Sequence, residues 1–281
     1  MLRAPRVDRY EQTVVHALAL YRAESEHALA HADAVEDLLV LDGPVYPTGL
    51  LSWVDRDPAL RRLIVEETEF TGVVENYRRL VERFVERSVP LIGFVKNTTT
   101  KAITQLLRQK TGAPWVDDAA FFRRVLERQE GGDRQTGELT FTNWFRSQAG
   151  SDGLLVDGEV SERSLRVAGT LEPTAYELTF FMIYDPRDDL LYRIEAPHAF
   201  TRDPAVRDRL RRYALCAVAA EGGPPLAIEK ADELARISRD GKQALRRRIE
   251  RVFGTERRTE YNDKRWGDQR SGPQRTGHSA R

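Results

Sequence analysis

Apolar residues recur in the first part of the chain at the spacing of one helix face. Val14, Leu18, Tyr21 and Ala28 follow this spacing, which predicts one long helix over positions 8–34. Further helices are predicted over residues 57–68, 70–88, 98–110, 117–128, 203–220, 225–237 and 239–252.

Two short apolar runs, at residues 38–42 and 88–96, are bounded by turn residues. Such runs are typical of strands buried on both faces. The long helical connection between them favours parallel neighbours in one sheet. Residues 176–184 and 190–195 flank a turn-rich stretch and predict an antiparallel hairpin. The pattern as a whole indicates an α/β protein.

One carboxylate stands at the end of the first apolar run. Gly43 and Pro44 follow Asp42 and end the strand, because glycine permits unusual dihedrals and proline removes a hydrogen-bond donor. In open α/β sheets ligands collect at the carboxyl ends of strands. Asp42 therefore stands where a substrate or cation would bind. The alternative is that Asp42 only caps a turn, as aspartate often does.

Composition narrows the protein class. The chain has 281 residues, of which 41% are hydrophobic, and its single cysteine excludes an intramolecular disulfide and a cysteine-built zinc site. We expect a cytoplasmic protein without a membrane span, since no apolar run approaches about 20 residues and the start lacks a signal-peptide pattern. With 44 basic and 44 acidic residues, no global charge indicates a nucleic-acid partner.

Lysine is rare among the basic residues, with six lysines against 38 arginines. Three of the six lie between residues 96 and 110, directly after the second predicted strand. Lys96 is placed to contact a phosphate as a compact point charge, or else is an exposed lysine at a strand end. Lys101 belongs to the same segment.

Several other candidates have an ordinary structural interpretation. Asp117 and Asp118 suit the N-terminus of a helix, where acidic residues complement the helix dipole. Arg193 and Glu195 alternate along a strand and share one face, which favours an internal ion pair. Aromatic residues such as Phe141 and Trp144 can stack on single-stranded bases, but such residues more often belong to a core.

The order of these motifs resembles the NurA nuclease family over about residues 8–250. The resemblance rests on the helix with Glu24 and Glu26, the strand ending at residues 41–44, the strand ending at 93–96, the hairpin arm at 193–197, and the helix start from 223 to 232. It implies an RNase H-like α/β fold with parallel strands, an added antiparallel hairpin and flanking helices.

The resemblance also implies a function. NurA proteins are DNA-repair nucleases that use Mn²⁺ or Mg²⁺ and partner the hexameric HerA helicase in double-strand break end resection. A homodimer is expected as well. On this basis residues 1–253 form the nuclease domain and residues 254–281 a disordered polar tail.

The family's site residues carry over to named positions. Asp42 matches the aspartate of the first strand, and Glu24 or Glu26 matches the glutamate of the long helix. Asp232 stands where the family has a histidine, and Gly223 where it has a tyrosine. The resemblance thus implies Asp42, Glu24, Glu26 and Asp232 as metal ligands, Asp42, Glu24 and Lys96 as catalytic residues, and Lys96, Lys101 and Lys230 as DNA-binding residues.

One departure concerns the start of the domain. An RNase H-like sheet begins with antiparallel strands that this chain has no room for before its first helix, so the domain is expected to be incomplete at the N-terminus. A strand as apolar as 38–42 would then have an unpaired edge. The alternative function is a non-catalytic NurA-like interaction module that lacks a complete metal site.

Overall fold

The computed structural model describes residues 9–47, 68–96, 102–111, 116–147, 169–236, 238, 240–244 and 247–248. The chain divides into two compact units, residues 1–231 and 232–281. The first unit contains the sheet and its covering helices. The tail expected over residues 254–281 lies outside the described residues, as does nearly all of the helix expected over 57–68.

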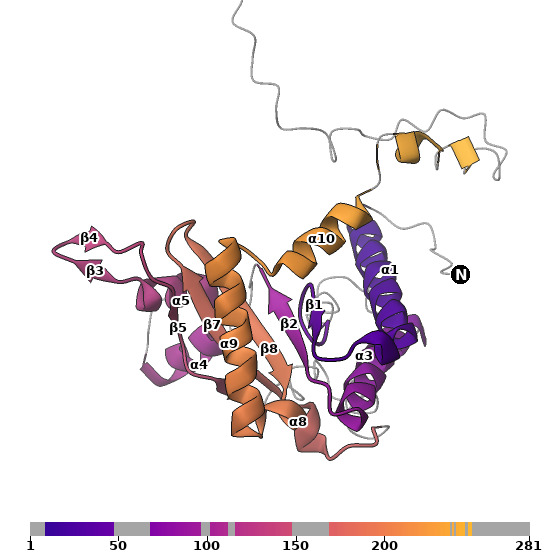
Figure 1. The fold of residues 1–281 in the computed structure, drawn as a ribbon, viewed down its shortest axis with the longest axis horizontal. Helices are drawn as coiled ribbons and strands as arrows, with labels where there is room; N and C mark the ends of the chain where they lie inside the picture. Colours follow the sequence, from indigo (N-terminus) through magenta and orange to yellow (C-terminus); the bar gives the residue numbers. More distant parts are fainter. Residues whose placement is uncertain are drawn as a thin grey trace, which may run out of the picture. The chain divides into compact units, whose positions relative to one another are not determined.

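A six-stranded mixed sheet forms the core of the first unit (Figure 1). In spatial order its strands are β1 (Leu39–Leu41), β2 (Leu91–Val95), β8 (Leu190–Pro197), β7 (Leu178–Asp185) and β5 (Thr140–Phe141), with β6 (Phe145–Ser147) also paired to β7. Strands β1 and β2 run parallel, and β7 and β8 form an antiparallel hairpin. Both of these pairings confirm the expectation from sequence. β2 joins the two parts by pairing antiparallel with β8.

Among the described residues, the helices predicted over 8–34, 70–88, 98–110, 117–128, 203–220 and 225–237 are present. They are α1 (Arg9–Ala30), α3 (Thr68–Glu86), α4 (Ala102–Thr111), α5 (Asp118–Leu126), α9 (Pro204–Glu221) and α10 (Leu226–Ala235), with a short helix α8 (His198–Thr201) after β8. In α3 the apolar residues Val73, Tyr77, Leu80 and Phe84 lie on one side and are all buried. Burial of this stripe against α1 and the sheet explains why the segment forms a helix there.

Alternation along the strands divides the core into layers. Phe94 of β2 and Phe181 of β7 pack under α9, against Leu210 and Ala214. The neighbouring strand residue Phe180 points to the other face and packs against Phe122 of α5. In Figure 1, α9 accordingly lies in front of β7 and β8, with α4 and α5 behind them. The sheet is thus covered on both faces.

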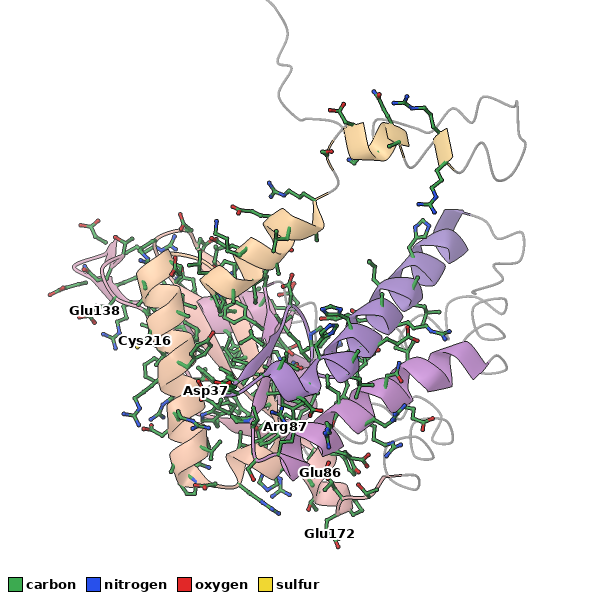
Figure 2. All side chains as sticks on the ribbon, turned by 45° about the vertical axis from the view of Figure 1, so that its right-hand side comes forward. Asp37, Glu86, Arg87, Glu138, Glu172 and Cys216 are labelled. Atoms are coloured by element: carbon green, nitrogen blue, oxygen red, sulfur yellow. The ribbon has the colours of Figure 1, made fainter. Side chains whose placement is uncertain are left out.

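Arg87 joins the end of α3 to the segment between α1 and β1. Its guanidinium donates to the carbonyl oxygens of Ala32, Asp33 and Val35, the last at 2.9 Å. Figure 2 labels Arg87 at this end of α3. One side chain therefore satisfies several backbone acceptors and fixes how the chain enters β1.

A second hairpin lies outside the main sheet. Its strands β3 (Gln129–Glu130) and β4 (Asp133–Arg134) pair antiparallel. Gly131 and Gly132, between them, both have positive φ, 62° and 94°. A two-residue turn with positive φ at both positions matches the twist of a hairpin. The glycine pair therefore makes a tight turn rather than a loop.

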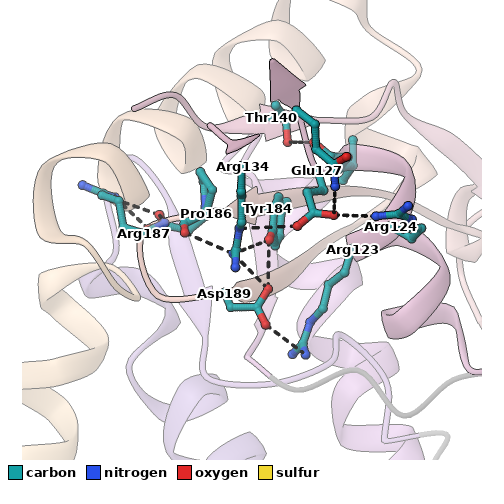
Figure 3. A network of polar contacts seen from close by, with 12 residues as sticks. Arg123, Arg124, Glu127, Arg134, Thr140, Tyr184, Pro186, Arg187 and Asp189 are labelled. Carbon is teal, nitrogen blue, oxygen red and sulfur yellow. Dashed lines mark hydrogen bonds and ion pairs between the residues drawn. The ribbon is translucent and has the colours of Figure 1, made fainter. Parts of the chain in front are cut away.

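Arg134 anchors this second hairpin to the first. It donates to the Tyr184 hydroxyl and, at 3.1 Å each, to Asp189 Oδ1 and the Pro186 carbonyl oxygen. Tyr184 in turn donates to Asp189 at 2.8 Å. Figure 3 shows these contacts meeting at the turn between β7 and β8, with Arg123 on the other side of Asp189. The network holds the turn of the β7–β8 hairpin.

The structure therefore shows a mixed α/β fold with flanking helices. Within the described part of the chain, β1 pairs with a strand on one side only. The RNase H-like assignment and the missing N-terminal strands stay predictions. None of the described helices is long and apolar enough to span a membrane.

Candidate functional site

Asp42 and Lys96 meet at the carboxyl ends of β1 and β2. Asp42 directly follows β1 and Lys96 directly follows β2, and the two strands are parallel neighbours. The Lys96 Nζ lies 3.0 Å from Oδ1 and 3.1 Å from Oδ2 of Asp42. Their side chains are 30% and 40% exposed, respectively. The parallel pairing of β1 with β2 thus brings these two side chains together at the edge where ligands collect in α/β sheets.

The turn after Asp42 lies directly against β2. A Cβ built on Gly93 would be 2.6 Å from the Gly43 carbonyl oxygen and 2.8 Å from the Val45 amide nitrogen. Only glycine at position 93 permits this approach, and Gly43 itself has φ +147°. The turn thereby directs Val45 and Tyr46 into the core, where both are fully buried.

Glu195 holds the same turn from β8. Its Oε2 accepts a hydrogen bond from the Val45 amide at 3.1 Å, and its Oε1 lies 2.8 Å from the Nε of Arg193. The Arg193 guanidinium stacks over the Phe180 ring, 4.0 Å from its centroid. The internal ion pair expected from the alternation of Arg193 and Glu195 is therefore confirmed. Its buried carboxylate fixes the backbone that carries Asp42.

Glu24 of α1 is the second carboxylate near the strand ends. It accepts a hydrogen bond from the Tyr77 hydroxyl at 2.8 Å, and Tyr77 packs edge-on against Tyr21. Burial raises the pKa of Glu24, the Tyr77 hydrogen bond partly opposes this, and the negative charge of Asp42 raises the pKa further. Glu24 and Asp42 thus interact electrostatically as like charges.

Glu26 lies elsewhere on α1. Two residues along a helix are about 200° apart around its axis. Glu26 is exposed and accepts a hydrogen bond from Arg22 at 2.8 Å. Of the two glutamates that sequence left open, Glu24 is the one whose pKa is raised by the charge of Asp42. The roles of Glu24 and Glu26 as metal ligands stay predictions.

These residues fit a divalent cation in part. Carboxylate oxygens are the hard ligands that Mg²⁺ and Mn²⁺ prefer, and Mg²⁺ is often bound by one or two carboxylates together with substrate phosphates. Asp42 and Glu24 match that minimal arrangement. No group of three or more His, Cys, Asp or Glu that could hold a metal occurs among the described residues. The described carboxylates alone do not form a closed metal site.

The remaining predicted site residues are placed as follows. Lys230 is exposed on α10. Asp232, also in α10, is the first residue of the second compact unit, so its predicted approach to Asp42 is not tested. Lys101 lies outside the described residues.

Asp117 and Asp118 have the structural roles expected of them. Asp117 caps α5, because its side chain accepts from the Ala120 amide at 2.7 Å. Asp118 is fully buried and accepts from the Thr104 amide, in the first turn of α4, at 2.8 Å. Both carboxylates therefore satisfy amides at helix N-termini.

Tyr77 is a site residue that sequence reasoning missed. Its ring belongs to the buried apolar stripe of α3. The signal was available, since a buried tyrosine needs a partner for its hydroxyl. Glu24 is that partner, although it lies 53 residues away.

A cavity of about 440 Å³ lies on a different part of the first unit. Its lining includes Leu139 and Phe141 from the β5 region and Leu215 and Cys216 from α9. Figure 2 labels Cys216 on α9. The site residues around Asp42 do not line this cavity, and its lining is mostly apolar. We therefore place the candidate chemistry at the strand ends and not in the cavity.

Comparison with known proteins gives one positive result. No curated protein matches the chain, and no solved structure matches it. Residues 6–237 match the NurA domain, which is more than half of the chain. This span includes Asp42, Glu24 and Lys96. The chain therefore belongs to the NurA family.

Proposed function

We propose that this protein is a metal-dependent DNA nuclease that hydrolyses phosphodiester bonds at the ends of β1 and β2. Membership of the NurA family associates the chain with nucleases. The observation that carries the proposal is the ion pair of Asp42 with Lys96 at the carboxyl edge of a parallel strand pair, where the charge of Asp42 also raises the pKa of Glu24. The two carboxylates can hold a cation and the lysine can contact a phosphate, so this edge suits a phosphate substrate.

Each residue has a distinct role in this proposal. Asp42 and Glu24 would hold Mn²⁺ or Mg²⁺, which when bound supplies a Lewis acid for the phosphate and an activated water. Lys96 presents a compact positive charge to a phosphate oxygen of the same DNA strand. Tyr77 orients Glu24 through its hydroxyl, and Glu195 holds the turn after Asp42.

Family membership supports the wider role. We propose that the protein acts in double-strand break end resection with a HerA-type hexameric helicase, as a homodimer in the cytoplasm. The RNase H-like fold belongs to the same proposal.

The test is cleavage of end-labelled single-stranded and double-stranded DNA by the purified full chain, with MnCl₂, with MgCl₂ and with EDTA. We expect cleavage with metal and none with EDTA. Asp42→Asn should lower the rate at least ~100-fold, because even outer-sphere changes at metal sites cost about 10–100-fold. Glu26→Gln is the matched control and should cleave as the wild type does. Cleavage in EDTA, or full activity of Asp42→Asn, would contradict the proposal.

The second candidate is a non-catalytic interaction module. It is favoured by the absence, among the described residues, of a cluster of three metal-binding side chains. A full chain that cleaves neither DNA form at saturating Mn²⁺, yet still binds a HerA-type hexamer, would select this candidate.

A further inference from the structure

Arginine is concentrated between the end of α8 and the middle of α9. Between residues 198 and 213 there are five arginines and two acidic residues, in a chain whose formal net charge is zero. The acidic residues are Asp203, which caps α9, and Asp208, which pairs with Arg211 and Arg212. This segment therefore carries a local positive excess that the whole-chain charge conceals.

Two of these arginines, together with Arg146, come from separate elements and lie around His198. Arg146 comes from β6, Arg202 follows α8, and Arg207 is in the second turn of α9. The His198 amide donates to the Glu177 carbonyl oxygen at 2.7 Å, the Glu177 carboxylate accepts from Arg146 at 2.6 Å, and the Arg202 amide donates to the His198 carbonyl oxygen at 2.9 Å. In keeping with this geometry, burial and the positive charges of Arg146, Arg202 and Arg207 lower the pKa of His198, whereas Glu177 opposes them.

The counter-charges are few. Arg146 donates to Glu177 at 2.6 Å while its side chain stays 43% exposed. Within the described part of the chain, neither Arg202 nor Arg207 forms an ion pair, and both are exposed. Two guanidinium groups on this surface thus have their charge available to an anion from solution.

An exposed aromatic ring continues the surface. Arg211 lies one turn after Arg207 on α9, and its guanidinium lies 6.0 Å from the centroid of the Phe141 ring. Phe141 of β5 is 43% exposed, whereas Phe145 and Trp144 pack against Phe180 and Phe181. Of these three aromatic residues, Phe141 is therefore the one with a largely exposed side chain.

Single-stranded nucleic acids are bound by this combination of a basic track with an aromatic platform. We propose that Arg146, Arg202, Arg207 and Arg211, together with Phe141, form a surface that binds single-stranded DNA. The arginines contact the phosphates, and the Phe141 ring stacks on a base. An acidic protein segment would satisfy the arginines but would leave the exposed ring unexplained.

The proposed surface is remote from Asp42. The choice of DNA as its ligand rests on the proposed function. The surface residues Phe141 and Arg146 belong to β5 and β6 at one edge of the sheet, while Asp42 follows β1 at the other edge. Four strand spacings separate these edges, roughly 19 Å. The surface therefore binds the DNA strand but takes no part in the cleavage of its phosphodiester bonds.

Binding is measured by fluorescence anisotropy of a fluorescein-labelled oligo(dT) 20-mer with the full chain in EDTA, from 50 to 200 mM salt. Arg202→Gln with Arg207→Gln should weaken binding about tenfold at low salt. It should also reduce the slope of log K against log[salt] by about 1.4, since each phosphate contact on a single strand contributes about 0.7. Phe141→Ala should weaken binding roughly fivefold or more with an unchanged slope.

The matched control is Arg79→Gln with Arg128→Gln, which removes the same charge from exposed positions on α3 and before β3. It should bind as the wild type does. The inference is overturned if the control weakens binding as much as Arg202→Gln with Arg207→Gln does, or if that double variant leaves the affinity unchanged. It is also overturned if a DNA duplex binds equally tightly and Phe141→Ala does not weaken this binding. If the double variant unfolds, as judged by its thermal melt, Arg207→Gln alone is measured, with half the change in slope expected.

The two proposals fail separately. Binding is measured without metal, so a chain that does not cleave DNA can still bear out this surface. A chain that cleaves DNA while Arg202→Gln with Arg207→Gln binds normally overturns the surface alone.

Discussion

Glu24 has a different effect on stability than on the proposed activity. Because its folded-state pKa is raised, its ionised form is disfavoured on folding. The resulting cost appears as pH rises from the unfolded value of about 4.3 and is fully present above the folded value. Glu24 belongs to the candidate metal site, and its ionised form therefore lowers the free energy of unfolding.

We predict that Glu24→Gln raises the thermal midpoint at pH 7, because the amide oxygen still accepts from Tyr77 without a charge facing Asp42. The gain should vanish at pH 3, where Glu24 is itself protonated and therefore neutral like the glutamine. Metal-dependent cleavage should fall at least ~100-fold. A lower midpoint at pH 7 would contradict this account, and Glu26→Gln should change neither property.

The pKa of Glu82 shifts in the opposite direction to that of Glu24. Burial alone would raise its pKa, but hydrogen bonds from Tyr176 and Thr170 and the charge of Arg78 outweigh burial and lower it. A carboxylate with a lowered folded-state pKa stabilises the protein above its unfolded value and loses this contribution as pH falls through the folded value.

We therefore predict that Glu82→Gln lowers the free energy of unfolding at pH 7 by about 2–3 kcal/mol. The difference from the wild type should shrink progressively below about pH 4. Urea unfolding at pH 7, 4 and 3 measures both. A difference that stays constant over this range would show that ionised Glu82 is not the source of the stabilisation.

At the scale of elements, the close contact between the Asp42 turn and β2 depends on a missing side chain. Gly93→Ala should destabilise the fold by about 1–3 kcal/mol, because the new methyl group meets backbone atoms of Gly43 and Val45 that cannot rotate away. Faster hydrogen exchange of the Val45 amide should accompany the loss, since its bond to Glu195 must shift.

Gly72→Ala is the control for this prediction. Gly72 lies in α3, where an added Cβ meets nothing within 4 Å. Alanine there should stabilise the helix by about 0.5–1 kcal/mol. Equal effects of the two substitutions would show that the close approach at Gly93 is unimportant.

The elements themselves could largely be predicted from sequence. The stripe of α3 and the apolar run of β2 repeat over enough residues for periodicity to identify them. The contacts between elements could not, because the bond from Val45 to Glu195 joins residues 150 positions apart. The sequence around Val45 and the sequence around Glu195 contain no signal that these two residues will be in contact. The pairing of Asp42 with Lys96 is an intermediate case, since parallel strands place their ends together.

At the scale of the whole molecule, the candidate cation site and the DNA should depend on each other. Asp42 and Glu24 supply few ligands, so a DNA phosphate is needed to complete the coordination of a cation. We predict that Mn²⁺ alone and a non-cleavable phosphorothioate oligonucleotide alone each raise the thermal midpoint slightly. Together they should raise it by more than the sum of the two shifts.

Differential scanning fluorimetry of the full chain measures this coupling. Asp42→Asn should abolish the excess shift while leaving the shift with oligonucleotide alone. Additive shifts in the wild type would indicate that the cation and the DNA bind independently of each other.

Cys216 is the single thiol of the chain, and it is exposed on α9. A nitroxide spin label attached through a thiol reagent would therefore occupy one position per chain without any engineered cysteine. In a symmetric dimer the two labels would give one intermolecular distance by pulsed electron paramagnetic resonance. The native protein thus already contains the probe needed to measure its own quaternary geometry.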